Sequence, residues 1–326
     1  MRPRSDGVLT DRWKAHWKTR WKSRWKARRI LRRVSRRMLH RVSRRMLHRV
    51  FRRAFGRAGY ARRMADTIRF ELLGPLRALR AEEEIPLGPP MQRTVLAVLL
   101  HLDGKSMSFG GLVDAVWGAE PPAHVRNLVQ KYVSGLRRAL RGTGPELVWT
   151  GSGYRLSGAR ADDLHDRREL VRAAVAARDR GDLHRAGELA GAAEALWRGE
   201  YAEGLAGPYL EAERRRWAEK RMLVLEARLE GGIALGRYEE CVHELVRLVA
   251  AHPLRERPAA LLMLALYRAG RSSDALLAYE EARRRIAGAM GADPGPALRT
   301  LHERILRQDP ALLGGVEEMA GRMAAV

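Results

Sequence analysis

The side chains best suited to chemistry lie on one face of residues 121–141. At about 100° per residue, a helix here would carry polar and cationic side chains opposite an apolar stripe. These side chains are Asn127, Gln130, Lys131, Ser134, Arg138 and Arg141, with Arg126 and Arg137 at the margin. Amides suit adenine edges and cationic groups suit guanine edges or phosphates in a DNA major groove. A solvated Arg-rich surface would have the same composition, so this stretch alone leaves both interpretations open.

Apolar spacing and turn residues predict the elements that would position this face. The stripe follows i, i+3, i+4 spacing through Val125, Leu128, Val129, Tyr132, Val133, Leu136, Ala139 and Leu140. An apolar helix is expected over residues 92–102, and Ser108 is expected to cap a second helix over 109–117. Residues 147–150 and 154–157 predict a β-hairpin around a Gly-rich turn.

Short strands are expected before these helices, over residues 67–73, 76–80 and 85–87, with a polar turn at 81–84. Small strands, three helices and a terminal hairpin predict a winged helix over residues 66–158. The hairpin would be the wing, and Arg155 would leave its turn towards a groove or a phosphate.

Residues 162–310 predict an all-α domain. Asp162 and Asp163 are expected to cap its first helix. Gly236 and Gly270 stand 34 residues apart, a spacing typical of tetratricopeptide helix pairs, which form protein-binding surfaces. On this pattern Cys241 is a small packing residue between helices. The fold class is therefore mainly α, with a winged helix followed by a tetratricopeptide-like domain.

Charge is distributed unevenly. The chain has 326 residues and a net charge of +24, of which residues 1–63 supply +22 through 24 basic and 2 acidic residues. In this arm the octapeptide RVSRRMLH occurs twice in succession. The arm is expected to be an over-extended start or a dispensable segment, with translation beginning at Met64. A basic amphipathic helix lying on nucleic acid or a membrane surface is the alternative.

The composition favours neither an enzyme nor a membrane protein. One cysteine excludes a disulfide framework and fits a reducing cytosol. The sequence has no apolar run near the ~20 residues of a membrane span and no secretory signal. It also lacks paired carboxylates, a catalytic triad and metal-ligand spacing. No catalytic residue, metal or cofactor is expected, and residues 311–326 are expected to be a tail.

The motifs of the first domain resemble a known family. LGPLRA, QRTVLAVLL, LVDAVWG, RNLVQKYVSGLRRAL and GYRL are similar to the OmpR-type winged helix of the Streptomyces antibiotic regulatory protein (SARP) family. The resemblance implies a recognition helix at residues 122–141, a wing tip at 151–155, and phosphate contacts from Gln92 and Arg93. Met91 stands where family members usually carry Arg, which removes one expected contact.

The second domain resembles the bacterial transcriptional activation domain of the same family through LWRG, EAERRRWAEKRMLVLEARLE and the segment beginning AAHPLRERPAALLMLALYRAG. With the first match, this covers residues 68–312 and corresponds to the family's small form. The resemblance implies a cytoplasmic, nucleoid-associated activator that binds promoter direct repeats as a homodimer. It further implies recruitment of RNA polymerase with its principal sigma factor, and regulation of antibiotic biosynthesis genes.

Two other functions fit the residues. One is a DNA binder that does not activate, such as a repressor or a nucleoid-type protein. The other is a protein–protein adaptor in which the helical repeats are the functional part.

Overall fold

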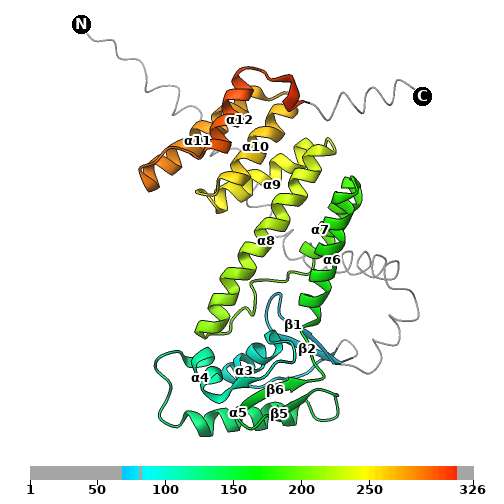
Figure 1. The fold of residues 1–326 in the computed structure, drawn as a ribbon, viewed down its shortest axis with the longest axis vertical. Coiled ribbons are helices and arrows are strands. Elements are labelled where there is room, and N and C mark those ends of the chain that lie inside the picture. Colours follow the sequence, from blue (N-terminus) through cyan, green and yellow to red (C-terminus); the bar gives the residue numbers. More distant parts are fainter. Residues whose placement is uncertain (1–67, 81–82, 314–326) are drawn as a thin grey trace, which may run out of the picture. The chain divides into compact units, whose positions relative to one another are not determined.

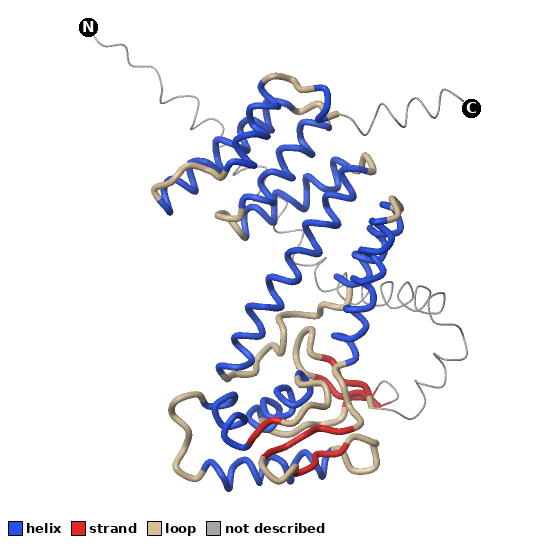
Figure 2. The backbone as a smooth tube through the Cα atoms, viewed as in Figure 1, coloured by secondary structure: helices blue, strands red, loops and turns tan. Residues whose placement is uncertain are grey.

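The computed structural model describes residues 68–80 and 83–313 (Figure 1). The basic arm expected over residues 1–63 lies outside the described residues, as do residues 314–326 of the expected tail. Among the described residues every named strand lies between residues 69 and 157, and helices follow (Figure 2). In the same ranges no helix combines the length and the apolar composition needed to cross a bilayer.

The first domain has two small antiparallel sheets and three helices. In the first sheet β2 lies between β1 and β3, and in the second β6 lies between β4 and β5. The elements are β1 Arg69–Glu71, β2 Arg77–Arg80, β3 Glu83–Glu84, α3 Pro90–His101, β4 Met107–Ser108, α4 Phe109–Trp117, α5 Val125–Ala139, β5 Glu146–Trp149 and β6 Gly153–Ser157. α3 contacts α4 and α5, and α5 contacts β5. This is the expected winged helix.

Local chemistry explains where the helices begin. The Ser108 hydroxyl accepts a hydrogen bond from the Gly111 N–H at 3.1 Å, so the expected cap of α4 is confirmed. α5 begins at Val125, three residues later than the resemblance implied. The N–H of Val125 donates to the carbonyl of Pro122, and this bond closes a turn before the helix. His124 has φ −102° and ψ 34°, outside the helical region.

The prediction of a strand over residues 85–87 is wrong. β3 instead occupies Glu83–Glu84, part of the expected polar turn, and pairs with β2. The Ile85 N–H still donates to the Ala78 carbonyl at 2.8 Å. Pro86 has no N–H, so the ladder ends there.

The second domain is entirely helical. Its elements are α6 Asp162–Asp179, α7 Leu183–Glu194, α8 Pro208–Ala234, α9 Tyr238–Ala251, α10 Glu256–Arg268, α11 Ser272–Met290, α12 Pro296–Leu306 and a 3₁₀ turn, η1, Pro310–Leu312. Three helix–helix turns contain Gly181, Gly236 and Gly270, with φ of 80°, 78° and 76°. Left-handed φ favours glycine, which explains the repeated glycine of the 34-residue pattern.

Cys241 has the expected packing role. Its thiol is buried and lies 3.6 Å from the Leu229 carbonyl of α8. A Cβ at Gly232 would come within 2.7 Å of the thiol sulfur, so the small residue lets α8 and α9 approach closely. Burial raises the pKa of Cys241, which makes the thiol a poor nucleophile.

Carboxylates near the start of α6 connect the two domains. Asp163 is 2% exposed and its Oδ2 accepts hydrogen bonds from the N–H groups of Leu72 and Leu73, both at 2.7 Å. Asp162 accepts from the N–H of Phe70 at 3.0 Å. Neither caps α6, whose N-cap is Ala161, so the expected capping is wrong. These side chains mainly satisfy backbone donors in β1 and just after it, about 90 positions earlier, while Oδ1 of Asp163 accepts from the N–H of Leu164 at 2.9 Å.

A second connection joins the end of α3 to α8. The ring of His101 lies 2.7 Å from the Tyr201 hydroxyl through Nδ1 and 3.2 Å from Glu213 through Nε2. Burial lowers the pKa of His101 although Glu213 opposes the shift. A neutral ring fits these partners, since its Nε2–H donates to Glu213 and its Nδ1 accepts from Tyr201. The junction is therefore held by directional polar contacts.

Candidate nucleic-acid interface

α5 separates its apolar and polar side chains cleanly. Val129, Val133 and Leu136 are at most 1% exposed and face the core of the first domain. The opposite side chains are exposed, namely Arg126, Asn127, Gln130, Lys131, Ser134, Arg137, Arg138 and Arg141. Residues 121–145 contain five basic and no acidic residues. The exposed face is therefore positive along its length and carries amides and a hydroxyl at its centre.

Two of these arginines are oriented by neighbouring elements. The Arg126 guanidinium lies 5.3 Å from the centre of the Phe109 ring at the start of α4, a cation–π distance. Arg137 donates to the Leu147 carbonyl of β5 through Nε at 3.0 Å and Nη2 at 2.8 Å. A guanidinium has five donors, so Arg137 can hold the hairpin and still bind an anion.

The hairpin places Arg155 away from α5. In the β5–β6 pairing Trp149 lies opposite Tyr154, and Val148 lies opposite Arg155. Alternate residues of a strand point to opposite faces. Trp149 and Tyr154 line a pocket with α5 residues, so Arg155 is on the outer face of the hairpin, where it is exposed.

Gly153 sets the position of the hairpin. A Cβ at this residue would collide with the Met107 carbonyl oxygen, because β4 crosses it closely. Ser108 pairs with Gly153 in the β4–β6 ladder. The glycine of the GYRL motif thus has a packing role beyond its expected role in the turn.

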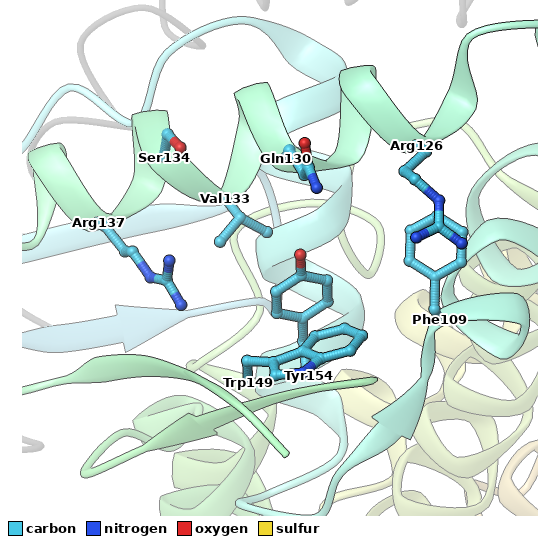
Figure 3. A pocket seen from close by; sticks show the side chains of 8 residues that line it. All are labelled: Phe109, Arg126, Gln130, Val133, Ser134, Arg137, Trp149 and Tyr154. Carbon is cyan, nitrogen blue, oxygen red and sulfur yellow. The ribbon is translucent and has the colours of Figure 1, made fainter. Parts of the chain in front are cut away.

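A pocket of about 410 Å³ lies between α5 and the hairpin (Figure 3). Its lining combines apolar and aromatic groups with polar and cationic ones. The residues are Phe109, Arg126, Gln130, Val133, Ser134, Arg137, Trp149 and Tyr154, and none is acidic. The pocket therefore fits a partner with both an anionic and an apolar surface.

Sequence patterns did not identify the aromatic part of this pocket. Trp149 is 49% exposed, whereas Tyr154, 5.0 Å away between ring centres, is 7% exposed. Leu147 and Trp149 share a strand face by alternation, but only Leu147 reaches the core. The available signal in the sequence was a tryptophan, Trp149, in the hairpin that follows the basic helix.

Gln92 does not have the expected position. It is 8% exposed, and its Nε2 donates to the Leu87 carbonyl at 2.9 Å. Its amide fits against Gly135 of α5, so the expected phosphate contact is replaced by a packing role. Arg93 donates to the Leu76 carbonyl at 3.0 Å, and its expected phosphate contact stays a prediction.

The described residues lack the constituents of a metal site. No group of three or more His, Cys, Asp or Glu side chains in residues 68–80 and 83–313 is arranged to hold an ion. An exposed, acid-free helix beside a β-hairpin is instead the arrangement by which helix-turn-helix proteins bind DNA.

Comparisons with known proteins agree with this class. The bacterial transcriptional activator domain family matches residues 163–306. Regulatory protein AfsR of Streptomyces coelicolor is 45% identical over 247 residues, which are 75% of this chain and 25% of AfsR. Regulatory protein DnrI of Streptomyces peucetius is 31% identical over 256 residues, covering 75% of this chain and 94% of DnrI. This chain thus spans about a quarter of AfsR and nearly all of DnrI.

A solved structure shares the fold. Mycobacterium tuberculosis EmbR, in complex with a low-affinity phosphopeptide, matches with a TM-score of 0.70 and 34% identity. The match covers 79% of this chain and 70% of that chain. The chain belongs to the Streptomyces antibiotic regulatory protein (SARP) family of transcriptional regulators.

Proposed function

We propose that this protein is a sequence-specific transcriptional activator. In this proposal, residues 66–158 bind promoter DNA and residues 162–310 contact the transcription machinery. The observation that carries the proposal is the exposed, acid-free face of α5 beside the β5–β6 hairpin. α5 has 15 residues, so it is about 22 Å long, and a major groove about 12 Å wide accepts such a helix.

The exposed side chains divide by chemistry into two roles. Asn127 and Gln130 suit adenine edges, and Lys131 and Arg138 suit guanine edges. Phosphate contacts suit Arg126, Ser134 and Arg137 of this face and Arg155 of the hairpin, and an arginine of the hairpin also suits a minor groove.

The wider function follows the family. We propose that the protein binds direct repeats near promoters as a homodimer. It then recruits RNA polymerase with its principal sigma factor, at genes of a secondary-metabolite cluster. The names of AfsR and DnrI as regulatory proteins support regulation, and the helical repeats supply a protein-binding surface.

The test has two stages, both with the full chain. Footprinting on the upstream regions of neighbouring genes should protect a pair of repeated sites. Transcription with purified polymerase holoenzyme should then give more open complex when the protein is present. Binding without this increase would identify a non-activating DNA binder. No duplex binding at low salt would favour an adaptor.

Single substitutions test the assigned roles. Lys131→Ala should reduce discrimination at a guanine position by about 1–3 kcal/mol. Arg137→Ala should weaken binding to all sequences and lower the slope of log K against log salt by about one unit. Arg172→Ala is the matched control, since it removes an exposed charge from α6, where Arg172 pairs with Glu169. If Arg137→Ala changed the base preference and left the salt slope unchanged, Arg137 would contact a base and not a phosphate.

A further inference from the structure

The pocket between α5 and the hairpin joins three aromatic side chains to two guanidinium groups. Trp149 and Tyr154 come from the hairpin and Phe109 from α4, with Arg126 and Arg137 at its two ends (Figure 3). Its 410 Å³ far exceeds the roughly 30 Å³ that one water takes up in the liquid, so more than an ordered water fits.

The exposed side chain of Trp149 gives the pocket a large apolar surface that a partner could cover. With 49% of its surface accessible, this is the largest side chain among the exposed large apolar residues of the described part of the chain. Tyr154 contacts it edge-on, with an angle of 69° between the ring planes, so one side of the indole is supported from within the hairpin. Covering an apolar surface that is held in this way lowers the free energy of the complex, so it strengthens binding.

The geometry of duplex DNA identifies the partner. One sugar–phosphate strand separates a major groove from the adjacent minor groove. If α5 lies in the major groove and the hairpin tip meets the minor groove, that strand must pass between α5 and β5. The pocket occupies this position, and Arg126 and Arg137 at its ends, with no acid in its lining, complement phosphates.

We propose that this pocket binds one DNA strand through its sugar–phosphate backbone, with Trp149 packing against a deoxyribose. The inference rests on the proposed DNA binding. It adds a contact that is the same for every DNA sequence. Trp149 supplies apolar contact and neutralises no phosphate, so its contribution is independent of salt. Arg137, fixed by the Leu147 carbonyl, supplies the salt-dependent part at the same place.

The test compares full-chain variants on the footprinted operator and on an unrelated duplex. Trp149→Ala should weaken binding to both by about tenfold with an unchanged salt slope, and Trp149→Phe should restore most of the affinity. Leu277→Ala is the control, because it truncates a side chain that is 60% exposed on α11. Thermal melts of each variant show whether the fold is retained.

The outcomes separate this inference from the proposed function. Wild-type affinity in Trp149→Ala would overturn the pocket assignment while leaving DNA binding intact. A loss limited to the operator would mean that Trp149 reads a base, and a lowered salt slope would mean that it acts through a phosphate contact. Either result overturns the sugar-packing role. No duplex binding by the wild-type chain would overturn the proposed function itself.

Discussion

Gly135, in the middle of α5, is the position where one added methyl group tests the contact between α5 and the buried side chain of Gln92. A Cβ there would overlap Oε1 of Gln92 and lie 2.8 Å from its Cδ. A Cβ at Gly88 would come within 2.5 Å of Nε2 of the same amide. The Gln92 amide therefore occupies a slot between two glycines, held by its hydrogen bond to the Leu87 carbonyl.

The change in the free energy of unfolding caused by Gly135→Ala is the sum of opposing effects. Alanine favours the helix by about 0.5–1 kcal/mol over glycine. The methyl group must displace the buried Gln92 amide, which breaks its bond to Leu87 and leaves a buried carbonyl unpaired, at a cost of about 1–3 kcal/mol. Overpacking adds a further cost of about 1–3 kcal/mol. The net loss in the free energy of unfolding should be about 1–3 kcal/mol, near the lower end of these summed costs, because the amide can shift in part.

A double-mutant cycle isolates the interaction between the Gln92 amide and a methyl group at position 135. Gln92→Ala removes the amide, so adding Gly135→Ala to it should stabilise the protein by about 0.5–1 kcal/mol. Urea unfolding of the four proteins, followed by circular dichroism, gives the coupling, expected at about 1.5–4 kcal/mol. Additive effects, with Gly135→Ala stabilising in both backgrounds, would refute the amide slot.

The control for this cycle is a helical glycine in open space. Gly191→Ala in α7 is suitable, because no heavy atom lies within 4 Å of the place that its Cβ would take. Gly104→Ala is unsuitable, since the φ of 81° at Gly104 strains alanine.

Two further predictions concern buried ionisable groups. Burial raises the pKa of Asp163 from about 3.8 to about 6, so the fold favours the protonated form, and stability should fall by about 2 kcal/mol as pH rises from 4 to 6. Asp163→Asn should remove this dependence, as measured by urea unfolding of both proteins at each pH; equal pH slopes would contradict the assignment. Cys241 should react with a thiol reagent at pH 8 at least about 100-fold more slowly in the native protein than in urea. Equal rates would show that α8 and α9 do not bury the thiol.

Elements governed by local spacing could be predicted from the sequence. The apolar stripe of α5, the Ser108 cap and the Gly236 and Gly270 turns depend on neighbours within a few residues, where helical periodicity and glycine conformation act.

Features that depend on distant residues could not be predicted in this way. Asp163 has the sequence position of a helix cap, but its partners lie about 90 residues earlier. Gln92 is polar yet buried on α3, and the two glycines at positions 88 and 135 and the Leu87 carbonyl that accommodate its amide are not apparent from local spacing. β4 has two residues, too few for alternation to be detected, and its pairing with Gly153 depends on the tertiary fold.

The polar junction has a consequence for promoter architecture. Backbone bonds from Arg198 to Leu73 and from Ala202 to Leu72 supplement the carboxylate contacts of Asp162 and Asp163, so the first domain is attached at several points. A DNA site bound by α5 would then set the direction in which the helical domain projects. Since the duplex turns once in about 10 base pairs, the rotational phase of such a site relative to a promoter would then become part of the regulatory signal.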